Sequence, residues 1–436
     1  MSKVNKEIFC NNIMDRYKSF SLENAEIRVL DEESISFKTR NLKLENIERS
    51  ESTQIIINAF KDNKQATITT NNIDYENPSD VLEKLSGMIE VLPEDKFSGL
   101  PDKQDYAQEI QDLKIFDSKN FADDYLISQA KEAEEEMLTN KKVTNTEGAS
   151  RSLSRKNYKI FSSKGFVGEY KKTLHSISAV AIAGKDTGMQ RDYEYSLATH
   201  EEDLLKPSII GQKAAERAVS RLNSKKIKSC KVDVIFEPRV AKSILSSFSS
   251  CINGNLIARG TSFLANKKDK QVLKKGINIS NNPHLIKGIG SSPFDKNGVK
   301  NNKIDIVKDG KLLNYFLDTR SSKQLQFKQN GNSNPANFTL NRGTQELKDI
   351  INNIKNGILV TEMLGMSFNS VNGDYSRGAS GFKIENGKIT FPVSEVTIAG
   401  NMNDMLLNLT PADNLSFDDN INTPSILIEN MTLAGV

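Results

Sequence analysis

A histidine followed by a glutamate, in the stretch THEEDLL at residues 199–205, is the first place where this sequence could do chemistry. A zinc-peptidase helix needs a second histidine on the same face, four residues on or five in a longer variant of the turn, with the glutamate as general base. Those two positions hold Leu204 and Leu205. No second ligand closes a metal site here, and the sequence instead predicts a solvated acidic turn before Pro207.

The elements that would position any site differ between the two halves of the chain. Apolar residues at helical spacing predict a helix from Val4 to Tyr17. Short alternating runs between residues 25 and 70 predict a strand meander, with turns at the polar stretches DEES and KDNK. A capped helix follows at residues 77–93, and a second, acidic helix at 121–139.

Longer strands return from about Ser150 to Leu197, and one of them carries His175. A lone histidine in a strand is more often a packing residue than a ligand. The stretch KPSIIGQKAAERAVSRLN then predicts a helix, because four apolar side chains share one of its faces.

The composition changes beyond residue 225. A buried strand at residues 229–238 is followed by a helix at 239–255, closed by Asn253 and Gly254. Short strands rich in Gly and Asn come next, with helices expected only near residues 344–357 and 402–409. Because helices and strands are segregated, the sequence predicts an α+β fold. We expect an N-terminal α+β domain (1–224) with an antiparallel sheet and flanking helices, then a β-rich C-terminal domain (225–436).

Bulk properties exclude several classes of protein. With 37% hydrophobic and 26% charged residues the chain is typical of a soluble globular protein. Its longest apolar run is too short for a membrane span, and we expect neither a membrane segment nor a secretion signal. Three widely spaced cysteines, Cys10, Cys230 and Cys251, indicate reduced thiols in the cytoplasm. The first 150 residues carry 19 basic against 30 acidic side chains, so the remainder is basic. Its lysines are scattered, and we do not expect specific nucleic-acid binding.

Four stretches, taken together, resemble a known family. They are IIGQKAAERAV from Ile209, NPHLIKGIGSSPFDKNGV from Asn282, VTEMLGMSFNSVNGDYSRGASGF from Val360 and FPVSEVTIAGNMNDML from Phe391. In this order and spacing they resemble the PmbA/TldE branch of the TldD/PmbA family, over most of residues 150–436. The segment GDYSRGASGF is the sharpest part of the resemblance.

The resemblance implies a soluble bacterial protein that belongs to a two-subunit protease. An older label of the family is modulator of DNA gyrase. In that family a TldD-type subunit holds zinc on a helix with the pattern HExxxH, completed by a C-terminal cysteine. The PmbA/TldE-type subunit pairs with it and helps to form a narrow channel for extended peptides. A homodimer is an additional possibility when the partner is absent.

Laid over HExxxH, the helix at residues 239–255 places Ser246 and Cys251 at the histidine positions and Ser247 at the glutamate position. A serine hydroxyl is a poor zinc ligand, and a general base needs a carboxylate or an imidazole. No cysteine follows Cys251. The resemblance therefore implies that this chain has no metal and no cofactor of its own, with zinc expected in the TldD-type partner. The plainer interpretation of these small side chains is a closely packed helix.

The residues that we expect in a substrate or partner groove lie in two segments. His284 belongs to the loop NPHLIKGIG, and the second segment is the glycine-rich stretch NGDYSRGASG. The predicted groove residues are His284, Asn372, Asp374, Tyr375, Ser376 and Arg377. Glycines in such a loop allow close approach of another backbone, so that an extended peptide could pair with an exposed edge strand. The alternative is a tight turn between two strands, with Arg377 solvated or paired to Asp374.

The leading hypothesis is a non-catalytic subunit of a TldD/TldE-type zinc metalloprotease that shapes the channel for extended peptides. One alternative is a self-sufficient metallopeptidase. A second is a modulator without enzymatic activity that binds a regulator or nucleic acid, which the basic C-terminal two-thirds would favour.

Overall fold

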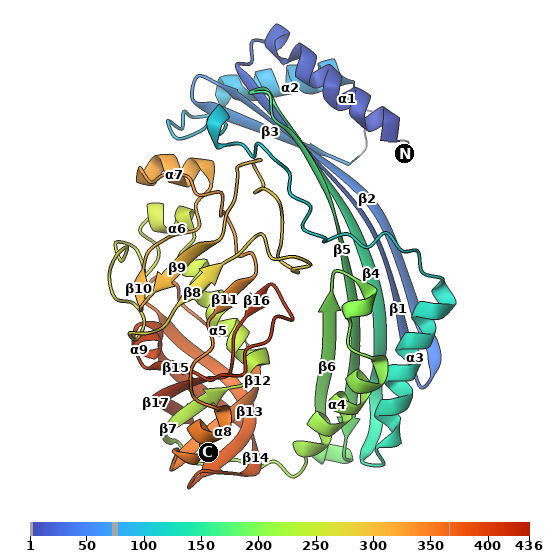
Figure 1. Ribbon diagram of the computed structural model, residues 1–436, viewed down its shortest axis with the longest axis vertical. Helices are drawn as coiled ribbons and strands as arrows, with labels where there is room; N and C mark the ends of the chain where they lie inside the picture. Colours follow the sequence, from blue (N-terminus) through green and yellow to red (C-terminus); the bar gives the residue numbers. More distant parts are fainter. Residues whose placement is uncertain (1–2, 72–76, 366) are drawn as a thin grey trace.

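The computed structural model describes residues 3–71, 77–365 and 367–436, and these form three sheets with helices around them (Figure 1). The first sheet has six antiparallel strands in the order β3-β2-β1-β4-β5-β6. Its strands are β1 (Asn24–Arg40), β2 (Lys43–Lys61), β3 (Lys64–Thr70), β4 (Val143–Ser162), β5 (Val167–Ala183) and β6 (Gln190–Ala198). The expected α+β class with an antiparallel N-terminal sheet is confirmed.

One predicted turn of the meander is wrong. The stretch DEES lies inside β1, which is continuous over 17 residues. Both neighbouring strands pair with it there, and its acidic side chains meet lysines: Asp31 pairs with Lys6, and Glu32 with Lys156. The other turn, KDNK, does join β2 to β3, with Asp62 and Asn63 at positive φ.

Four helices cover one face of this sheet (Figure 1). They are α1 (Lys3–Arg16), α2 (Pro78–Val91), α3 (Asp123–Thr139) and α4 (Pro207–Ser220), and a 3-10 turn, Tyr17–Phe20, follows the first. Phe161 packs with α1 and α2, whereas Ala149, on the same face of β4, packs with α3 and α4. Side chains alternate along a strand, so Tyr158 and Ile160 point to the opposite face. That face is turned toward the C-terminal half.

The C-terminal half is built around a closed sheet. Strands β14, β13, β12, β7 and β17 form a ring, because β14 pairs with both β13 and β17, and β15 adds to β17. Only the β7–β12 pair is parallel among these strands of the described chain. The strands are β7 (Cys230–Phe236), β12 (Asn356–Leu364), β13 (Asp374–Glu385), β14 (Lys388–Asn401), β15 (Leu409–Pro411) and β17 (Ile426–Ala434).

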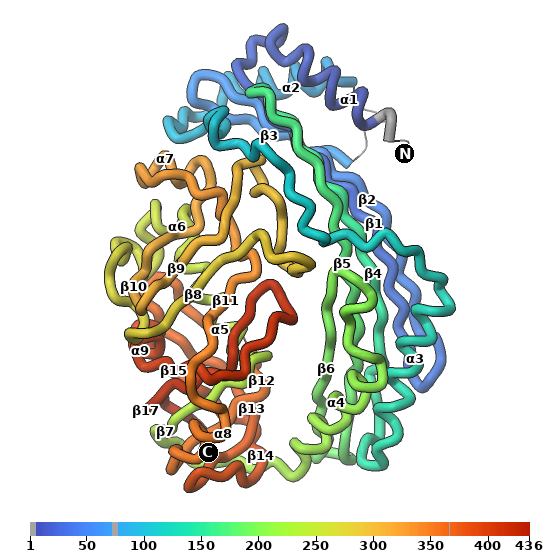
Figure 2. The backbone as a smooth tube through the Cα atoms, viewed as in Figure 1, coloured from blue at the N-terminus to red at the C-terminus, as the bar shows by residue number. Residues whose placement is uncertain are grey.

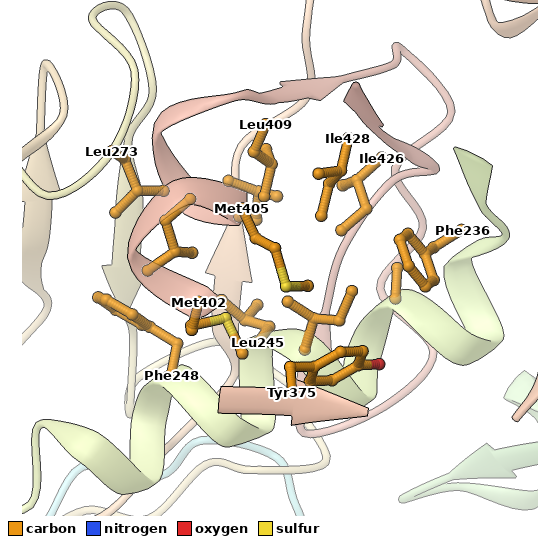
Figure 3. Packing of buried hydrophobic residues seen from close by; sticks show 14 of the residues in the cluster. Phe236, Leu245, Phe248, Leu273, Tyr375, Met402, Met405, Leu409, Ile426 and Ile428 are labelled. Carbon is orange, nitrogen blue, oxygen red and sulfur yellow. The ribbon is translucent and has the colours of Figure 1, made fainter. Parts of the chain in front are cut away.

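The third sheet is small and shares the hydrophobic core of the ring. Its order is β10-β9-β8-β11-β16. The strands are β8 (Ile279–Asn281), β9 (Ile304–Lys308), β10 (Lys311–Leu312), β11 (Phe338–Leu340) and β16 (Ile421–Asn422). Helix α5 (Pro238–Cys251) packs against both sheets of this half and shares their core with α9 (Met402–Leu407), as Leu245, Phe248 and Met402 show in Figure 3.

The C-terminal half holds two helices that the sequence did not lead us to expect, besides the expected α8 (Leu347–Asn352) and α9. They are α6 (Gly254–Ala258) and α7 (Thr319–Leu325). Asn253 does not close α5, because its side chain accepts from the Asn255 N–H and caps α6. Helix α7 begins with a capping box formed by Asp318 and Ser321. Both helices are too short to show an apolar period.

A long extended segment crosses between the two halves (Figure 2). Residues 92–122 join α2 to α3 with one 3-10 turn at Lys103–Asp105. Backbone hydrogen bonds tie this segment to β5 at Thr173 and to the loop after β8 at Lys287 and Lys300. None of the helices in the described residues is long and apolar enough to cross a membrane. The domain boundary near residue 225 stays a prediction.

Candidate functional site

Helix α5 carries the three positions that correspond to HExxxH. Pro238 occupies its first turn, where a missing N–H costs nothing, and the helix stays α-helical as far as Cys251. Its apolar face is buried in the large C-terminal core, which leaves a polar edge of small residues. Ser246 and Ser247 lie on that edge and are partly buried.

The serines of this edge are engaged with the helix itself. The hydroxyl of Ser247 donates to the carbonyl of Ser243 (3.0 Å), and those of Ser249 and Ser250 donate to the carbonyl of Ser246 (2.7 and 3.1 Å). Such bonds are typical of serines inside a helix. They hold the hydroxyl hydrogens toward the backbone.

Cys251 is fully buried in the same core as Phe248. Burial raises the pKa of its thiol to about 12, so that the sulfur keeps its proton at neutral pH. A zinc site needs deprotonated sulfur, imidazole or carboxylate. No group of three or more His, Cys, Asp or Glu side chains that could hold a metal occurs in residues 3–71, 77–365 and 367–436. The residues present on α5 do not suit zinc.

The THEEDLL stretch forms the predicted acidic turn, a 3-10 turn over Glu201–Asp203. Glu202 pairs with Lys119 (2.8 Å) and with Lys287 (3.1 Å), and Asp203 pairs with the same Lys287 (2.8 Å). The turn therefore connects the loop after β8 to the first half of the molecule through ion pairs with Lys287.

His175 is fully buried in β5 between two charged groups. Its Nδ1 lies 3.1 Å from Arg151 Nη2, and its Nε2 lies 3.2 Å from Asp117 Oδ2. Burial, with Arg151 nearby, lowers the pKa of the imidazole to about 4. A neutral, enclosed ring fits the packing role that the sequence indicates.

The glycine-rich stretch is not a loop. Asp374–Arg377 begin strand β13 and pair with Asn401–Ile398 of β14. On the other side Asn369 donates its N–H to Asp374 O (2.9 Å), and Ser376 donates its own to Ser367 O (3.1 Å). The start of β13 is an inner strand, so it has no free edge for an added peptide. The first two residues of the stretch, Asn372 and Gly373, do belong to a turn, whereas the residues from Asp374 onward are strand and neither loop nor turn.

The predicted residues of this stretch point in different directions. Tyr375 is 2% exposed, and its hydroxyl lies 3.4 Å from Met363 Sδ in the core. Arg377 does not pair with Asp374: its Nη1 donates to Ser243 Oγ on α5 (3.0 Å), and its buried Nε has no partner among the described residues. The carboxylate of Asp374 instead accepts from the side-chain amide of Asn372 (2.7 Å).

The structure thus brings Arg377 to the helix of Ser246 and Ser247. Asp374, Tyr375 and Ser376 line a shallow hollow at the start of β13. His284 lies elsewhere, in the loop that faces the first sheet. There its Nε2 lies 2.7 Å from Asn301 Oδ1, and its backbone N–H donates to Asn282 Oδ1 (3.1 Å). The six predicted groove residues therefore do not form one site.

A cavity that sequence reasoning missed lies beside the His284 loop. It has a volume of about 490 Å³ and is bounded by the helix-free face of the first sheet and by residues 283–301 and 331–336. Tyr170 and Lys172 of β5 and Asp295 of the loop belong to its wall. The available signal was Tyr170 and Lys172 at a spacing of two, on the strand face opposite the buried one.

Comparisons with known proteins agree with this architecture. Three models of the PmbA/TldA metallopeptidase match in succession: domain 1 at residues 25–89, the central domain at 116–222 and the C-terminal domain at 229–435. The metalloprotease PmbA of Escherichia coli O157:H7 is 33% identical over 95% of this chain and 92% of its own length. A PmbA homologue of Haemophilus influenzae is also 33% identical, over 94% of this chain and 92% of its own.

Solved structures show the same fold. A Bacteroides thetaiotaomicron protein named as a candidate modulator of DNA gyrase superimposes with a TM-score of 0.92 at 27% identity, over the full length of both chains. TldE from Thermococcus kodakarensis superimposes with a TM-score of 0.84 at 19% identity, over 98% of this chain and all of its own, which shows the fold alone. With its domains matched in order and a third of its residues identical to those of full-length relatives, the chain belongs to the PmbA/TldD metallopeptidase family.

Proposed function

We propose that this chain is the non-catalytic subunit of a TldD/TldE-type metalloprotease that cleaves extended peptides. The single observation that carries the proposal is the state of helix α5. At the positions of HExxxH it presents two serines and a buried, protonated thiol. Without a carboxylate or imidazole there is neither a zinc ligand nor a general base on this helix. A TldD-type partner would supply the zinc and the glutamate.

The remaining architecture supports a shaping role for the chain. The bond from Arg377 to Ser243 joins the start of β13 to α5, which also shares a core with the ring sheet. Exposed Asn372, Asp374 and Ser376 lie at the end of that unit and could contact a partner or a peptide. His284 would act differently, by holding Asn301 at the other end of its own loop, between β8 and β9.

A reconstitution assay tests the proposal. This chain, a TldD-type chain from the same genome and their mixture are each given an unfolded fluorogenic peptide, and zinc per chain is measured after dialysis. We expect near-zero zinc in this chain. We also expect the mixture to cleave the peptide much faster than either chain alone. Equal activity, or equal inactivity, of the mixture and the single chains contradicts the proposal. Chelator-sensitive cleavage by this chain alone would establish the self-sufficient metallopeptidase instead.

Matched variants sharpen this assay. Ser246→Ala and Ser247→Ala remove only hydroxyls that donate within the helix or lie on its edge, so the mixture should keep its activity. Replacing the HExxxH glutamate of the partner with glutamine should abolish activity. The reverse pattern would assign the catalytic helix to this chain. Steeply salt-dependent DNA binding by a peptidase-inactive mixture would favour the modulator alternative.

The compartment and the assembly belong to the same proposal. All three cysteines are free thiols, and that of Cys230 is exposed, which fits a reducing cytoplasm. We expect a heterodimer with the TldD-type chain and, in its absence, a homodimer or a monomer. Light scattering of the single chain and of the mixture distinguishes these states.

A further inference from the structure

The cavity beside the His284 loop has an aromatic wall. Tyr158 and Tyr170 stack with ring centroids 4.9 Å apart, and Phe294 meets Tyr170 edge-on at 5.2 Å. These rings come from two strands of the first sheet and from the loop at residues 283–301, so the cavity lies where the two halves meet (Figure 1). Its volume of about 490 Å³ falls in the range of small-molecule sites.

One lysine in the wall differs from the other cations there. Arg28, Lys159 and Lys296 each have a carboxylate partner, respectively Glu26 (3.0 Å), Glu7 (2.8 Å) and Asp318 (3.3 Å).

Lys172 has no carboxylate partner among the described residues. Its Nζ donates to one carbonyl, that of Ser291 (3.2 Å), which leaves two of its three hydrogens unassigned. The charged side chain that acts on it is another cation, Lys156, and burial lowers the pKa of the Lys172 amine to about 8. Burying an unpaired ammonium is costly, and an anion in the cavity would remove that cost.

The loop whose Ser291 carbonyl accepts from Lys172 is itself held in place by hydrogen bonds. Asn337 accepts the Gly290 N–H (2.8 Å) through its side-chain oxygen and donates to Ser291 Oγ (2.8 Å) through its amide nitrogen. A Cβ on Gly290 would lie 1.8 Å from Asn420 Oδ1, so only glycine fits there. The Ser291 carbonyl is therefore preorganised, and so is the direction of the Lys172 amine.

Asp295 supplies a second polar group without a full set of partners. It is 7% exposed; Oδ1 accepts the N–H groups of Asn297 and Val299, both at 2.9 Å, and buried Oδ2 has no partner in the described chain. Burial raises the pKa of this carboxyl to about 7. Near neutral pH part of the population carries a proton on the carboxyl, and in that form the group can donate to an oxygen of a ligand.

We propose that this cavity binds the free C-terminal carboxylate of a peptide, with Lys172 as its ion-pair partner and the rings of Tyr158 and Tyr170 against the last side chain. The choice of a peptide rests on the proposed function, whereas the choice of a carboxylate rests on the lone ammonium. An aromatic wall favours a carboxylate attached to an apolar group over a small inorganic anion.

Calorimetry on the full chain, without any partner, tests the site. The probes are an N-acetylated dipeptide ending in phenylalanine as the free acid, the same dipeptide as its C-terminal amide, and inorganic phosphate. A hydrogen-bonded charge typically contributes about 1.5–3 kcal/mol, so the acid should bind roughly ten- to hundredfold more tightly than the amide. Phosphate should bind more weakly than the acid.

Two variants identify the residue responsible. Lys172→Met should bring the affinity for the acid down to that for the amide and leave the amide unchanged. Lys171→Met is the control, because Lys171 is exposed and lies over the Phe116 ring, 5.4 Å from its centroid. Since Lys172→Met removes a half-buried ammonium without a carboxylate partner, its melting temperature should equal or exceed that of the wild type. A loss of binding therefore cannot be assigned to unfolding.

The outcomes separate this inference from the proposed function. No binding of the acid, equal affinity for acid and amide, phosphate binding as tight as the acid, or an unchanged Lys172→Met variant overturns the site, even if the mixture with a TldD-type chain cleaves peptides. Acid-selective binding that depends on Lys172 supports it, even if that mixture proves inactive.

Discussion

Asp192 joins the two halves of the molecule through two buried arginines. It is 3% exposed at the start of β6, and its Oδ1 lies 2.8 Å from Arg239 Nη1 at the start of α5. Its Oδ2 lies 3.4 Å from Arg221 Nη1, just after α4. Both guanidinium groups are 8% exposed, and Arg239 also lies over the Tyr193 ring, 4.5 Å from its centroid.

Asp192→Asn removes the charge and keeps the shape. Arg221 retains a second carboxylate, that of Glu362, but Arg239 is left with uncharged acceptors, namely the new amide oxygen and the carbonyls of Tyr193 and Thr361. Breaking a buried pair by removing one partner costs about 3–5 kcal/mol, because the other charge stays buried without compensation. We expect a loss of this size in the free energy of unfolding.

Equilibrium unfolding in guanidinium chloride, followed by circular dichroism, measures this loss. The control is Glu147→Gln, since Glu147 pairs with Arg191 at the surface with both side chains 46% exposed, and such pairs contribute about 0–1 kcal/mol. Combining Asp192→Asn with Arg239→Met should recover part of the loss. If Asp192→Asn costs no more than the Glu147 control, the buried bridge does not hold the halves together and the reasoning is refuted.

Three further predictions concern the pH dependence of stability and the packing of helices. The pKa of His175 in the folded protein is about 4, below its usual 6.5, so between these pH values the unfolded chain binds more protons than the folded one. The free energy of unfolding should therefore fall by up to about 3 kcal/mol as the pH drops through that window. In His175→Gln this fall should be smaller. The pKa of Asp295, raised from 3.8 to about 7, has the opposite sign, so the stability of Asp295→Asn relative to wild type should rise between pH 4 and 7, by on the order of 2–4 kcal/mol. Unfolding at several pH values checks both, and parallel curves for variant and wild type would contradict them. Gly211→Ala places a Cβ 2.0 Å from the carbonyl oxygen of Ala133 and should destabilise the folded protein by about 1–3 kcal/mol. Its control, Gly87→Ala, lies at an open exposed position of α2 and should stabilise the protein by about 0.5–1 kcal/mol. Equal melting temperatures of the two variants would contradict the close approach of α3 and α4.

The long elements could be predicted because their local patterns are strong. The four large helices of the first half carry an apolar stripe or clear end signals, and β5 alternates buried and half-buried residues from Thr173 to Ala183. The continuity of β1 could not be predicted, since DEES has the composition of a turn. Its charges are tolerated in a strand because α1 and β4 bring lysines to them, and those contacts are long-range.

In the candidate site, too, local sequence patterns predicted some features, whereas features that depend on long-range contacts could not be predicted. Ser246, Ser247 and Cys251 could be placed on one helix because the flanking strand and loop fix that helix in the sequence. The glycine-rich stretch was misplaced as a loop, because glycine in a strand looks like a turn signal when the closely packed partner is unknown. Gly381 is such a case: a Cβ there would lie 1.9 Å from the carbonyl oxygen of Leu359 on β12. The cavity at Lys172 could not be predicted, since its walls come from segments more than a hundred residues apart.

The angular spacing of Ser246 and Cys251 around the axis of α5 argues against a metal site independently of their side-chain chemistry. Residues five apart on a regular α-helix are separated by roughly 140° around the axis, because each residue turns by about 100°. Ser246 and Cys251 obey this geometry: Ser246 is partly exposed at the polar edge, whereas Cys251 is fully buried in the core. A π-turn, with its wider i→i+5 hydrogen bonds, would bring positions five apart closer to one face, but α5 is α-helical from Pro238 to Cys251. Because Cys251 points into the core and Ser246 lies at the polar edge, these two positions do not meet at one metal ion in this helix. For that reason a metal centre on α5 would need a different helical geometry as well as different side chains, and this supports the proposal that a partner chain carries the catalytic zinc.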